Sequence, residues 1–389
     1  MKIRFLLMNA YSVGGTIRAT YNTAAGLADR HDVEIVSVYQ RRPSSRFRPD
    51  PRVPVRALSP EVPGDERGRL DGLWTKVPSV LIPASERRHR NFTALTDLRL
   101  AGYLRSLRDG VLVTTRPGLN VAAARLAGPG VVVVGQEHLY LANHPRPLRR
   151  SIARAYPRLD LVSALTERDA DDYRNLLRGR TRVVRMPNAV PEVLPRASGD
   201  SKVIVAAGRL TPQKGFDRLI PAFAAVAERH PDWRLRIFGS GTERPLLEGL
   251  VKRYRLADQV SLMGYTDRLW EEMAGAAMYV LSSRNEGFPM VLLEAMAVGL
   301  PVVSFDCRNG PADMITHGVD GLLVPQGDVA RLATSICSLI EDPVLRSIMG
   351  NAARRTAATY DLPTICTRWE QLFEELVAQR ACRGVRRHG

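Results

Sequence analysis

Both halves of this 389-residue chain open with the same pattern: a short apolar run, a turn that contains glycine, and an amphipathic stretch. In the first half, "KIRFLLMNA" (2–10) leads through Gly14-Gly15 to "TIRATYNTAAGLADR" (16–30). In the second half, "SKVIVAAGRL" (201–210) leads through "TPQKG" to "FDRLIPAFAAVAERH" (216–230). An apolar run followed by helical periodicity is the opening unit of a doubly wound α/β domain. The duplication therefore predicts two such domains, which agrees with the length of the chain.

Further apolar runs alternate with helical patterns along both halves. They lie at 32–39, 109–117, 130–138 and 158–166 in the first half, and at 233–241, 259–265, 276–283 and 300–306 in the second. Their hydrophobicity is continuous and does not alternate, which indicates parallel strands buried on both faces. Residues 43–66 hold many prolines and arginines, and we expect them to form a loop.

A polar stretch with proline and glycine, "PEVLPRASGDS" (191–201), separates the two predicted domains. We therefore predict one domain over 1–195 and a second over 200–362. A long helical pattern at 363–380 follows the second domain, and we expect it to pack back towards the first. Open parallel sheets bind ligands at the carboxyl ends of their strands. Two such domains that face each other predict a ligand site in a central cleft.

Charge is distributed unevenly between the halves. The whole chain has a formal net charge of +16; residues 1–199 hold 33 Lys and Arg against 18 Asp and Glu, whereas residues 200–389 hold 23 against 22. An arginine-rich genome would explain a general excess but not its confinement to one half. Such a field favours an anionic partner, which could be nucleic acid, an acidic lipid surface, or a phosphorylated or acidic small molecule.

Composition narrows the class of protein further. No uninterrupted apolar stretch reaches the roughly 18 residues that a membrane span needs. The N-terminal apolar run contains Arg4 and ends in a Gly-Gly turn, so we expect a buried strand there and not a secretory signal. We expect a cytoplasmic protein, with a peripheral position on the inner membrane face as an option. Neither a disulfide framework nor a zinc site is expected, because C-x-x-C spacing is missing among Cys307, Cys337, Cys366 and Cys382.

Two cations follow the first strand of the second half. Arg209 lies at the strand end, and Lys214 lies five residues further on, just before Gly215 and the next helical pattern. A strand-end arginine with a loop lysine beside a helix N-terminus can bind a diphosphate. Cations at helix starts are common on protein surfaces, so the pattern alone leaves a structural role open. The choice of lysine favours function slightly, because only five of the 56 cationic residues are lysines.

Two glutamates, Glu286 and Glu294, lie within "NEGFPMVLLEAM" (285–296). This stretch predicts a loop followed by a helix with Pro289 in its first turn, so the backbone amides of 287–291 would form an anion site reinforced by the helix dipole. At about 1.5 Å per residue, the glutamates would lie roughly 12 Å apart along the helix axis. Glycoside hydrolases place their two carboxyl groups about 5–5.5 Å or about 6.5–9.5 Å apart. The spacing therefore favours a clamp on an extended ligand.

Together these motifs resemble a known family. Glu286 and Glu294 in "NEGFPMVLLEAMAVGLPVV", with Gly208-Arg209, "QKG" (213–215) and "HGVDGLLVPQGD" (317–328), resemble the retaining nucleotide-sugar glycosyltransferases of family 4, which have the GT-B fold. The likeness covers about 203–328 with the motifs in the same order. In the first half it is looser and rests on Gly14-Gly15 and "GQEHLY" (135–140). The opening "GGTIRAT" and the segment 288–290 depart from the usual family pattern.

The resemblance implies a role for each motif. Glu286 would contact the donor sugar, Glu294 would bind the nucleotide ribose, and His138 would lie against the sugar and the acceptor. The implied reaction transfers a sugar with retained anomeric configuration, whereas the retaining pathway itself stays open. Neither an obligatory metal nor another cofactor is expected, because cations and a helix N-terminus would stabilise the leaving diphosphate. Besides Glu294, the implied donor-binding residues are Gly15, Arg209, Lys214, Gly287, Phe288, Pro289, Met290 and Val291.

Family frequency and charge suggest the substrates. A UDP-sugar is the preferred donor, with a GDP-mannose-dependent mannosyltransferase as the alternative. The basic first half suggests an anionic or lipid-linked cell-surface glycan or polymer as acceptor, with an acidic membrane surface as a further option. The segment "DCRNGPAD" (306–313) resembles a subgroup that acts on cell-wall or surface polymers.

Other functions fit the residues less well. A nucleic-acid-binding protein would explain the basic half, but its basic clusters lack interleaved aromatic residues. A dinucleotide oxidoreductase would carry G-x-G-x-x-G after a first strand, and neither half does. A non-catalytic protein on the same fold would not need two strand-end cations together with two glutamates. The "DAD" triplet (169–171) falls in a polar helical pattern, where we expect a solvated helix face and not a metal site.

Overall fold

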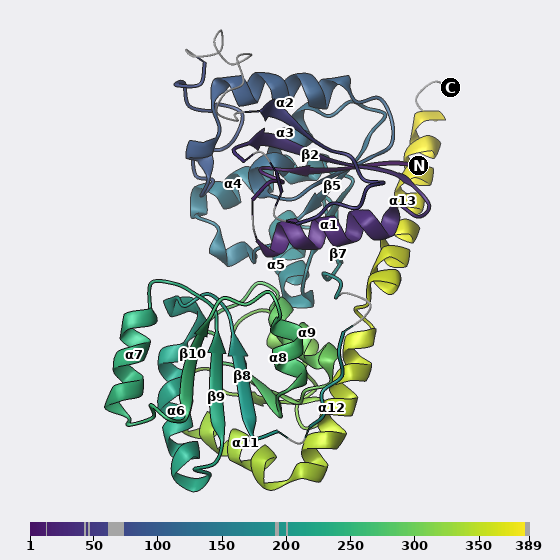
Figure 1. Ribbon diagram of the computed structural model, residues 1–389. Coiled ribbons are helices and arrows are strands. Elements are labelled where there is room, and N and C mark those ends of the chain that lie inside the picture. Colours follow the sequence, from purple (N-terminus) through teal and green to yellow (C-terminus); the bar gives the residue numbers. More distant parts are fainter. Residues whose placement is uncertain are drawn as a thin grey trace. The chain divides into compact units, whose positions relative to one another are not determined.

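The computed structural model describes residues 1–385 except 13, 43, 46, 61–73, 191–193 and 200. The chain divides into two compact units, which we call unit 1 (Met1–Ala189 with the segment from Leu362 onward) and unit 2 (Val190–Asp361). Each unit is a parallel sheet with helices on both faces, as Figure 1 shows. Parts of the expected loop (43–66) and of the expected linker (191–201) lie outside the described residues.

Unit 1 is built on a seven-stranded parallel sheet in the order β3-β2-β1-β4-β5-β6-β7. In its centre, Phe5 of β1 pairs with Ile35 of β2 on one side and with Val113 of β4 on the other. All three side chains are buried, because helices cover both faces of the sheet. The strands are β1 (Lys2–Leu7), β2 (Asp32–Gln40), β3 (Val55–Pro60), β4 (Val111–Thr114), β5 (Val132–Gln136), β6 (Leu161–Ala164) and β7 (Arg182–Arg185).

Two helices from distant parts of the chain share one face of this sheet. They are α1 (Gly15–Leu27) and α13 (Leu362–Val385), which lie side by side in Figure 1. Trp369 and Phe373 of α13 stack at 5.1 Å and share a core with Tyr21 of α1. The helical pattern expected at 363–380 is thus part of unit 1. On the other face lie α2 (Ala94–Ser106), α3 (Pro117–Leu126), α4 (Arg146–Ala155) and α5 (Glu167–Leu177).

Unit 2 repeats the plan with a six-stranded parallel sheet in the order β10-β9-β8-β11-β12-β13. Its outermost registers join Leu235 to Val260 at one side and Val303 to Leu322 at the other. The strands are β8 (Val203–Ala207), β9 (Arg234–Phe238), β10 (Val260–Gly264), β11 (Met278–Leu281), β12 (Val302–Phe305) and β13 (Gly321–Val324).

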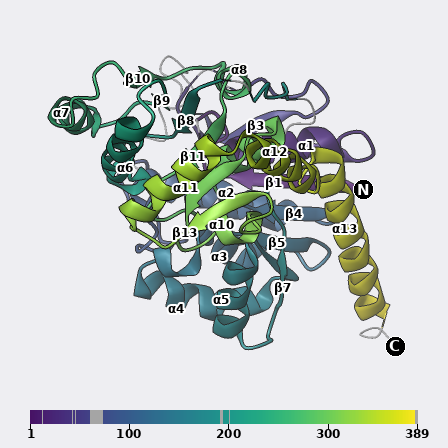
Figure 2. The ribbon, with the colours of Figure 1, turned by 90° about the horizontal axis from the view of Figure 1, so that it is seen from below.

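The helices of unit 2 also divide between two faces. On one face, α6 (Phe216–Arg229) lies beside α11 (Val329–Glu341), as Figure 2 shows. Phe223 and Ile336 from these two helices belong to the same buried cluster. The other helices are α7 (Arg244–Arg253), α8 (Leu269–Ala274), α9 (Met290–Val298), α10 (Pro311–Met314) and α12 (Pro343–Ala358), of which α9 packs against β11, β12 and α12.

The structure corrects the expectation for residues 43–66, because β3 occupies 55–60. This strand pairs only with β2, and most of its side chains are partly or fully exposed. An edge strand does not need the continuous apolar run that marks a central strand. The edge strand β7 was missed for the same reason, and β13, an apolar edge strand of four residues, was also missed. No helix in the described part of the chain is long and apolar enough to cross a membrane.

Candidate functional site

Two loops of unit 2 meet at the carboxyl ends of neighbouring strands β8 and β11. The first runs from Gly208 through the short 3-10 helix η5 (Pro212–Lys214), and the second runs from Ser282 to Pro289. The backbone of Arg284 donates to the Gln213 carbonyl at 2.7 Å, and the Gln213 amide donates to the Asn285 carbonyl at 3.0 Å. Hydrogen bonds in both directions hold the loops together without a ligand.

A bidentate ion pair fixes the same junction from outside. The two terminal nitrogens of Arg284 lie 2.7 and 2.6 Å from the two carboxylate oxygens of Asp217, in the first turn of α6. Hydrogen bonds from Arg284 lower the pKa of Asp217, so this carboxylate stays ionised. Gly215 lets the loops approach closely, because it has φ 66° and a Cβ there would lie 2.1 Å from the Ser282 carbonyl oxygen.

The structure brings Lys214 and Glu286 into direct contact. Lys214 Nζ lies 2.7 Å from Glu286 Oε1, and the Ser283 hydroxyl donates to the same oxygen at 2.6 Å. The Glu286 side chain is 7% exposed and that of Lys214 15%, so solvent screens this ion pair only weakly. An ammonium has three donors, so the bond to Glu286 leaves Lys214 two for other oxygens.

Arg209, the other predicted phosphate ligand, follows Gly208 at the end of β8. Its side chain is exposed and makes no hydrogen bond or ion pair within the described residues. Gly208 brings the backbone of this turn against the Lys214 side chain, because a Cβ on Gly208 would lie 3.0 Å from Lys214 Cε. The two cations of this strand end therefore differ: Lys214 is partly buried and paired, whereas Arg209 is open to solvent.

The start of α9 differs slightly from the expected geometry. The helix begins at Met290, and Pro289 is its N-cap residue and does not lie in the first turn. The Met290 amide donates to the Phe288 carbonyl at 2.9 Å, and Pro289 has no N–H. Of the five predicted amides, those of Gly287, Phe288 and Val291 make no backbone hydrogen bond in the described part of the chain. The predicted anion site is narrowed to these three.

Glu294 lies inside α9 and is buried, at 3% exposed. Its charge acts on Tyr279, a buried residue whose hydroxyl donates to the Ala207 carbonyl at 3.2 Å. Burial raises the pKa of Tyr279, and the charges of both Glu286 and Glu294 add to the increase. Burial together with Glu286 also raises the pKa of Cys307 to about 12. Both predicted carboxylates therefore act on one buried region of unit 2.

In unit 1, a pocket of about 460 Å³ lies at the carboxyl ends of the central strands, and we call it the strand-end pocket. Gly15, at the start of α1, and His138, just after β5, both line it. Burial, followed by the charge of Arg116, lowers the pKa of His138 to about 4. The imidazole is therefore neutral at pH 7, and its buried Nε2 has no hydrogen-bond partner within the described residues.

Arginines line one side of the strand-end pocket. Arg116, at the N-terminus of α3, donates to Glu86 at 2.7 Å, and Glu86 also accepts from the Gly118 backbone at 3.1 Å. The guanidinium of Arg41 lies 4.9 Å above the ring of Tyr39, within cation–π range. Burial raises the pKa of Tyr39, whereas the charges of three arginines lower it: Arg41, Arg116 and Arg88. These cations therefore converge on one tyrosine at the end of β2.

Behind His138, a buried polar network surrounds Glu137. The Asn120 amide donates to Glu137 Oε1 at 2.9 Å and to the Tyr156 hydroxyl at 2.8 Å, and the Tyr156 hydroxyl donates to Glu137 Oε1. The other carboxylate oxygen lies 3.5 Å from Nε2 of His144. The network joins β5, α3, the segment after α4 and the loop before α4, and so fixes the backbone next to His138.

The "DAD" triplet does not form the fully solvated helix face that we expected. Asp169 is buried at the start of α5, where its amide donates to the Thr166 hydroxyl at 3.1 Å and its carboxylate accepts from the same hydroxyl at 2.9 Å. Asp171 is exposed and pairs with Arg174 at 2.7 Å. The two carboxylates therefore serve the helix cap and the helix surface.

The predicted residues thus fall into two groups. Gly15 and His138 line the strand-end pocket of unit 1, and the other nine lie around the β8 and β11 strand ends and α9 in unit 2. Sequence analysis missed the polar side chains that lie around the predicted residues of unit 1. Glu137 directly follows β5, and Arg116 lies two residues after the end of β4, so position after a strand would have been a usable signal for both. Glu86 carries no such signal.

Two doubly wound α/β units with polar sites at their strand ends have the architecture of the GT-B class of proteins. A model described as "Glycosyl transferase 4-like domain" matches residues 14–189, and one described as "Glycosyl transferases group 1" matches residues 195–356. The two matches fall on either side of the boundary between the units. The chain belongs to the GT-B glycosyltransferases.

Two relatives with curated names are longer than this chain. It is 39% identical over 396 residues to the exopolysaccharide phosphotransferase of Streptomyces coelicolor, an alignment that covers 98% of this chain and 41% of that protein. It is 27% identical over 227 residues to the poly(glycerol-phosphate) alpha-glucosyltransferase of Bacillus subtilis, covering 57% of this chain and 34% of that protein. The chain thus spans less than half the length of either relative.

Solved structures share the fold at low identity. Sucrose-phosphate synthase from Thermosynechococcus elongatus has a TM-score of 0.77 and 20% identity, covering 97% of this chain and 99% of that one. A variant of S. aureus TarM, in complex with fondaparinux, alpha-GlcNAc-glycerol and UDP, has a TM-score of 0.72 and 16% identity, covering 96% and 99%. Both likenesses support the GT-B architecture.

Proposed function

We propose that this protein transfers a sugar, with retained anomeric configuration, from a nucleoside-diphosphate sugar to a hydroxyl of an anionic or lipid-linked cell-surface glycan or polymer. The observation that carries the proposal is the contact between Lys214 and Glu286 where the β8 and β11 loops meet. It places a lysine with spare donors beside a carboxylate at a sheet end where ligands bind. The exposed Arg209 on the same turn supplies a second cation for a diphosphate.

The proposed roles of these residues are those that the family resemblance implies. Lys214, Arg209 and the amides of Gly287, Phe288 and Val291 stabilise the negative charge that develops when the bond between sugar and diphosphate breaks. Glu286, held by Lys214 and Ser283, contacts the sugar, and Glu294 binds the ribose. His138 is neutral at pH 7, so it donates or accepts a hydrogen bond without adding charge. In this scheme cations of the chain take the place of a metal.

A UDP-sugar is our preferred donor, and GDP-mannose is the alternative. The TarM variant, which has the same fold, was solved in complex with UDP. The acceptor class rests on the arginines of the strand-end pocket, on the excess charge of residues 1–199, and on two names. The relatives are called an exopolysaccharide phosphotransferase and a poly(glycerol-phosphate) alpha-glucosyltransferase. Both names describe work on polymers.

A peripheral position on an acidic membrane face is a further part of the proposal. Helix α4 buries Leu148 and Ile152, and it has no acidic residue. An arginine recurs every four residues on its exposed side and just beyond it, which gives a row along one face. Vesicle sedimentation with Arg150→Glu tests this part: unchanged binding to acidic vesicles contradicts it. The row consists of Arg146, Arg150, Arg154 and Arg158.

A panel of nucleotide sugars tests the function as a whole. Donor hydrolysis and thermal stabilisation are measured for UDP- and GDP-sugars, and then transfer to poly(glycerol phosphate). We expect a UDP-sugar to give both signals, while a response to GDP-mannose alone selects the mannosyltransferase. No response to any donor, together with nucleic-acid binding that falls steeply with salt, would favour a non-catalytic anion-binding protein.

A further inference from the structure

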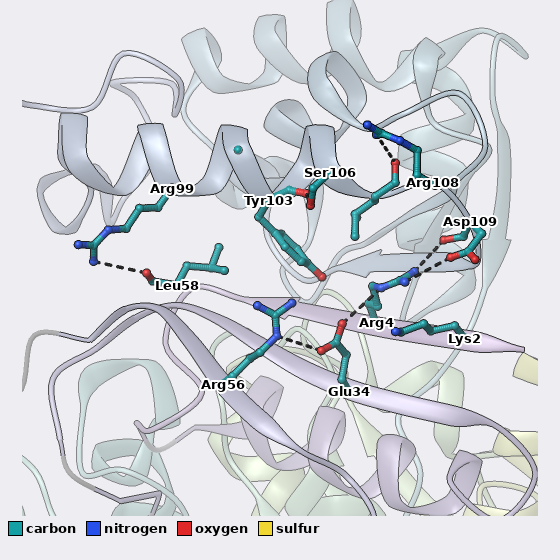
Figure 3. Close-up of a pocket in the computed structure, with 12 residues that line it drawn as sticks. Lys2, Arg4, Glu34, Arg56, Leu58, Arg99, Tyr103, Ser106, Arg108 and Asp109 are labelled. Atoms are coloured by element: carbon teal, nitrogen blue, oxygen red, sulfur yellow. Dashed lines mark hydrogen bonds and ion pairs between the residues drawn. The ribbon is translucent and has the colours of Figure 1, made fainter.

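Unit 1 has a second basic pocket, of about 700 Å³, at the opposite end of its sheet. We call it the strand-start pocket. It is formed by residues near the starts of β1, β2 and β3, the second half of α2, and the loop before β4, as Figure 3 shows. A six-residue strand such as β1 separates it from the strand-end pocket by roughly 20 Å. Its cations are Lys2, Arg4, Arg56, Arg99 and Arg108, against the acids Glu34 and Asp109.

The acidic residues of this pocket bind two arginines, but they leave donors of one of them unused. Glu34 accepts from Nε of Arg56 at 3.0 Å and lies 3.3 Å from Nε of Arg4. Arg4 also donates to the backbone carbonyl of Asp109 at 2.7 Å and to the carboxylate of Asp109 at 3.3 Å. Arg56 uses only Nε, so its two terminal nitrogens make no hydrogen bond or ion pair in the described part of the chain.

A buried tyrosine lies beside the Arg56 guanidinium. Tyr103 is 8% exposed, and its hydroxyl has no hydrogen-bond partner among the described residues. The Arg56 guanidinium lies 5.0 Å from the centre of the Tyr103 ring, and Figure 3 shows both side chains directed into the pocket. Burial and the charge of Glu34 raise the pKa of Tyr103, so its hydroxyl remains a donor. A buried hydroxyl without a partner costs free energy unless a ligand satisfies it.

We propose that the strand-start pocket binds a phosphate ester, with the Arg56 fork and the Tyr103 hydroxyl as its donors. A phosphate offers three acceptor oxygens and up to two negative charges, and it accepts a bidentate arginine contact. A phosphate has one more acceptor oxygen than a carboxylate and can carry a second charge, so both terminal nitrogens of Arg56 and the Tyr103 hydroxyl can each contact a separate oxygen. Glu34 positions Arg56 by holding its Nε. The ligand is either a soluble phosphate ester or the phosphate of an acidic lipid headgroup.

The site is independent of the proposed transfer reaction. It lies at the strand starts, whereas Arg209, Lys214 and Glu286 belong to unit 2 and His138 to the opposite sheet end. A direct binding measurement therefore tests it without a donor or an acceptor. The probes are glycerol 1-phosphate, followed by calorimetry, and vesicles of phosphatidylglycerol against phosphatidylcholine, followed by sedimentation, all with the full chain.

Two variants decide the test. Tyr103→Phe keeps the ring and removes only the hydroxyl, and Arg56→Gln removes the fork from an edge strand. We expect each to weaken phosphate binding by about tenfold or more, the effect of one hydrogen bond to a charged group. The matched control is Arg108→Gln, which also removes a charge from the pocket. The Arg108 guanidinium already donates to the carbonyls of Arg105 and Leu107, so we do not expect it to bind the phosphate. Its effect should stay within about twofold.

The outcomes separate the alternatives. Binding of glycerol 1-phosphate that depends on Tyr103 supports a soluble ligand, and binding of phosphatidylglycerol vesicles alone, with the same dependence, supports a lipid headgroup. Equal losses in Arg108→Gln and Arg56→Gln would mean unspecific attraction and would overturn the proposal. Binding lost only in Lys214→Ala would assign the phosphate to unit 2. A lower melting temperature of Tyr103→Phe without ligand would give the hydroxyl a structural role, which also overturns the site.

Discussion

The polar sites of the two units differ in how far their groups are satisfied without a ligand. In unit 2, Lys214 is already paired with Glu286, and direct hydrogen bonds join the two loops that carry them. In unit 1, Nε2 of His138 has no hydrogen-bond partner among the described residues, and Glu137 and His144 stand 3.5 Å apart, beyond good hydrogen-bond distance. Under the proposed function, the donor side would therefore be organised in advance, whereas the acceptor side would leave polar groups for its ligand to satisfy.

We expect the largest loss of activity when a single charge is removed from the site in unit 2. Under the proposed function, Lys214→Ala removes a cation that would stabilise the leaving diphosphate, and it leaves Glu286 buried without its ion-pair partner. We expect kcat to fall by about 100- to 1,000-fold, the usual loss when one preorganised donor is removed. Initial rates of nucleotide release measure it. The control is Lys202→Ala, an exposed lysine of the same unit; if both variants stay within about threefold of the parent, the role of Lys214 is wrong.

The unsatisfied imidazole of His138 in unit 1 should make the stability of the protein depend on pH. His138 has a pKa of about 4 in the folded chain, below the ordinary 6.5, so the unfolded chain binds a proton between these values and the folded chain does not. Stability from this group is complete above pH 6.5 and is lost as the pH falls towards 4. Between pH 7 and 4, we expect His138→Gln to lose less free energy of unfolding than the parent, by on the order of 3 kcal/mol.

Urea denaturation of both chains across this range measures that difference. Other groups that titrate near pH 4 cancel because both chains contain them. A packing defect caused by the substitution appears as a constant offset, which the comparison at pH 8 removes. Parallel curves for the two chains would show that the imidazole is not held neutral.

The ribose contact should have a smaller effect, confined to the donor. Glu294→Gln keeps the shape of the side chain and removes the charge that would accept two ribose hydroxyls. We expect kcat/KM for the donor to fall by about 10- to 100-fold, consistent with lost hydrogen bonds to a charged group, mostly through KM. Glu248→Gln, on the exposed side of α7, is the matched control. Undiminished activity of Glu294→Gln and Glu294→Ala would remove the clamp from the proposal.

The smallest effect is expected at the rim of the strand-end pocket. Arg88 is exposed, and its charge reaches Tyr39 together with those of Arg41 and Arg116. Arg88→Gln should raise KM for a polyanionic acceptor several-fold and flatten its salt dependence, because exposed charges contribute about 1 kcal/mol or less each. The donor KM should not change. Arg268→Gln in unit 2 removes an exposed charge elsewhere; an equal effect there would mean that net charge alone matters.

The sequence predicts the sheet centres better than their edges. Central strands such as β1 and β8 are buried on both faces, so they appear as continuous apolar runs. The edge strands β3 and β7 have a partner on one side only and mix polar with apolar residues, whereas the edge strand β13 is apolar but only four residues long. The loop expected at 43–66 was wrong for this reason, and the start of α9 shifted by one residue, which is within ordinary uncertainty of helix ends.

The candidate site divides along a similar line. Lys214 and Glu286 are 72 positions apart, yet each stands in a local motif after a strand, and so both could be picked from sequence. The pairing between them, and the support from Ser283, depends on β8 and β11 being neighbours in the sheet. The network around Glu137 draws on residues from 114 to 156 in the chain, which no local pattern joins. Candidate site residues can therefore be recognised in local sequence motifs, whereas the contacts between them depend on the order of the strands in the sheet.

The position of α13 has a consequence for biosynthesis. Unit 2 is continuous in sequence, but the apolar face that Trp369 and Phe373 cover in unit 1 is completed only by a helix translated after unit 2. At about 5–20 residues per second, the ribosome needs roughly 9 to 35 seconds to add the intervening 172 residues of unit 2. During this interval the nascent first sheet lacks one of its two covering helices on that face, while the whole of unit 2 can fold. Ribosome-bound chains that end before Leu362 should therefore recruit chaperones through unit 1.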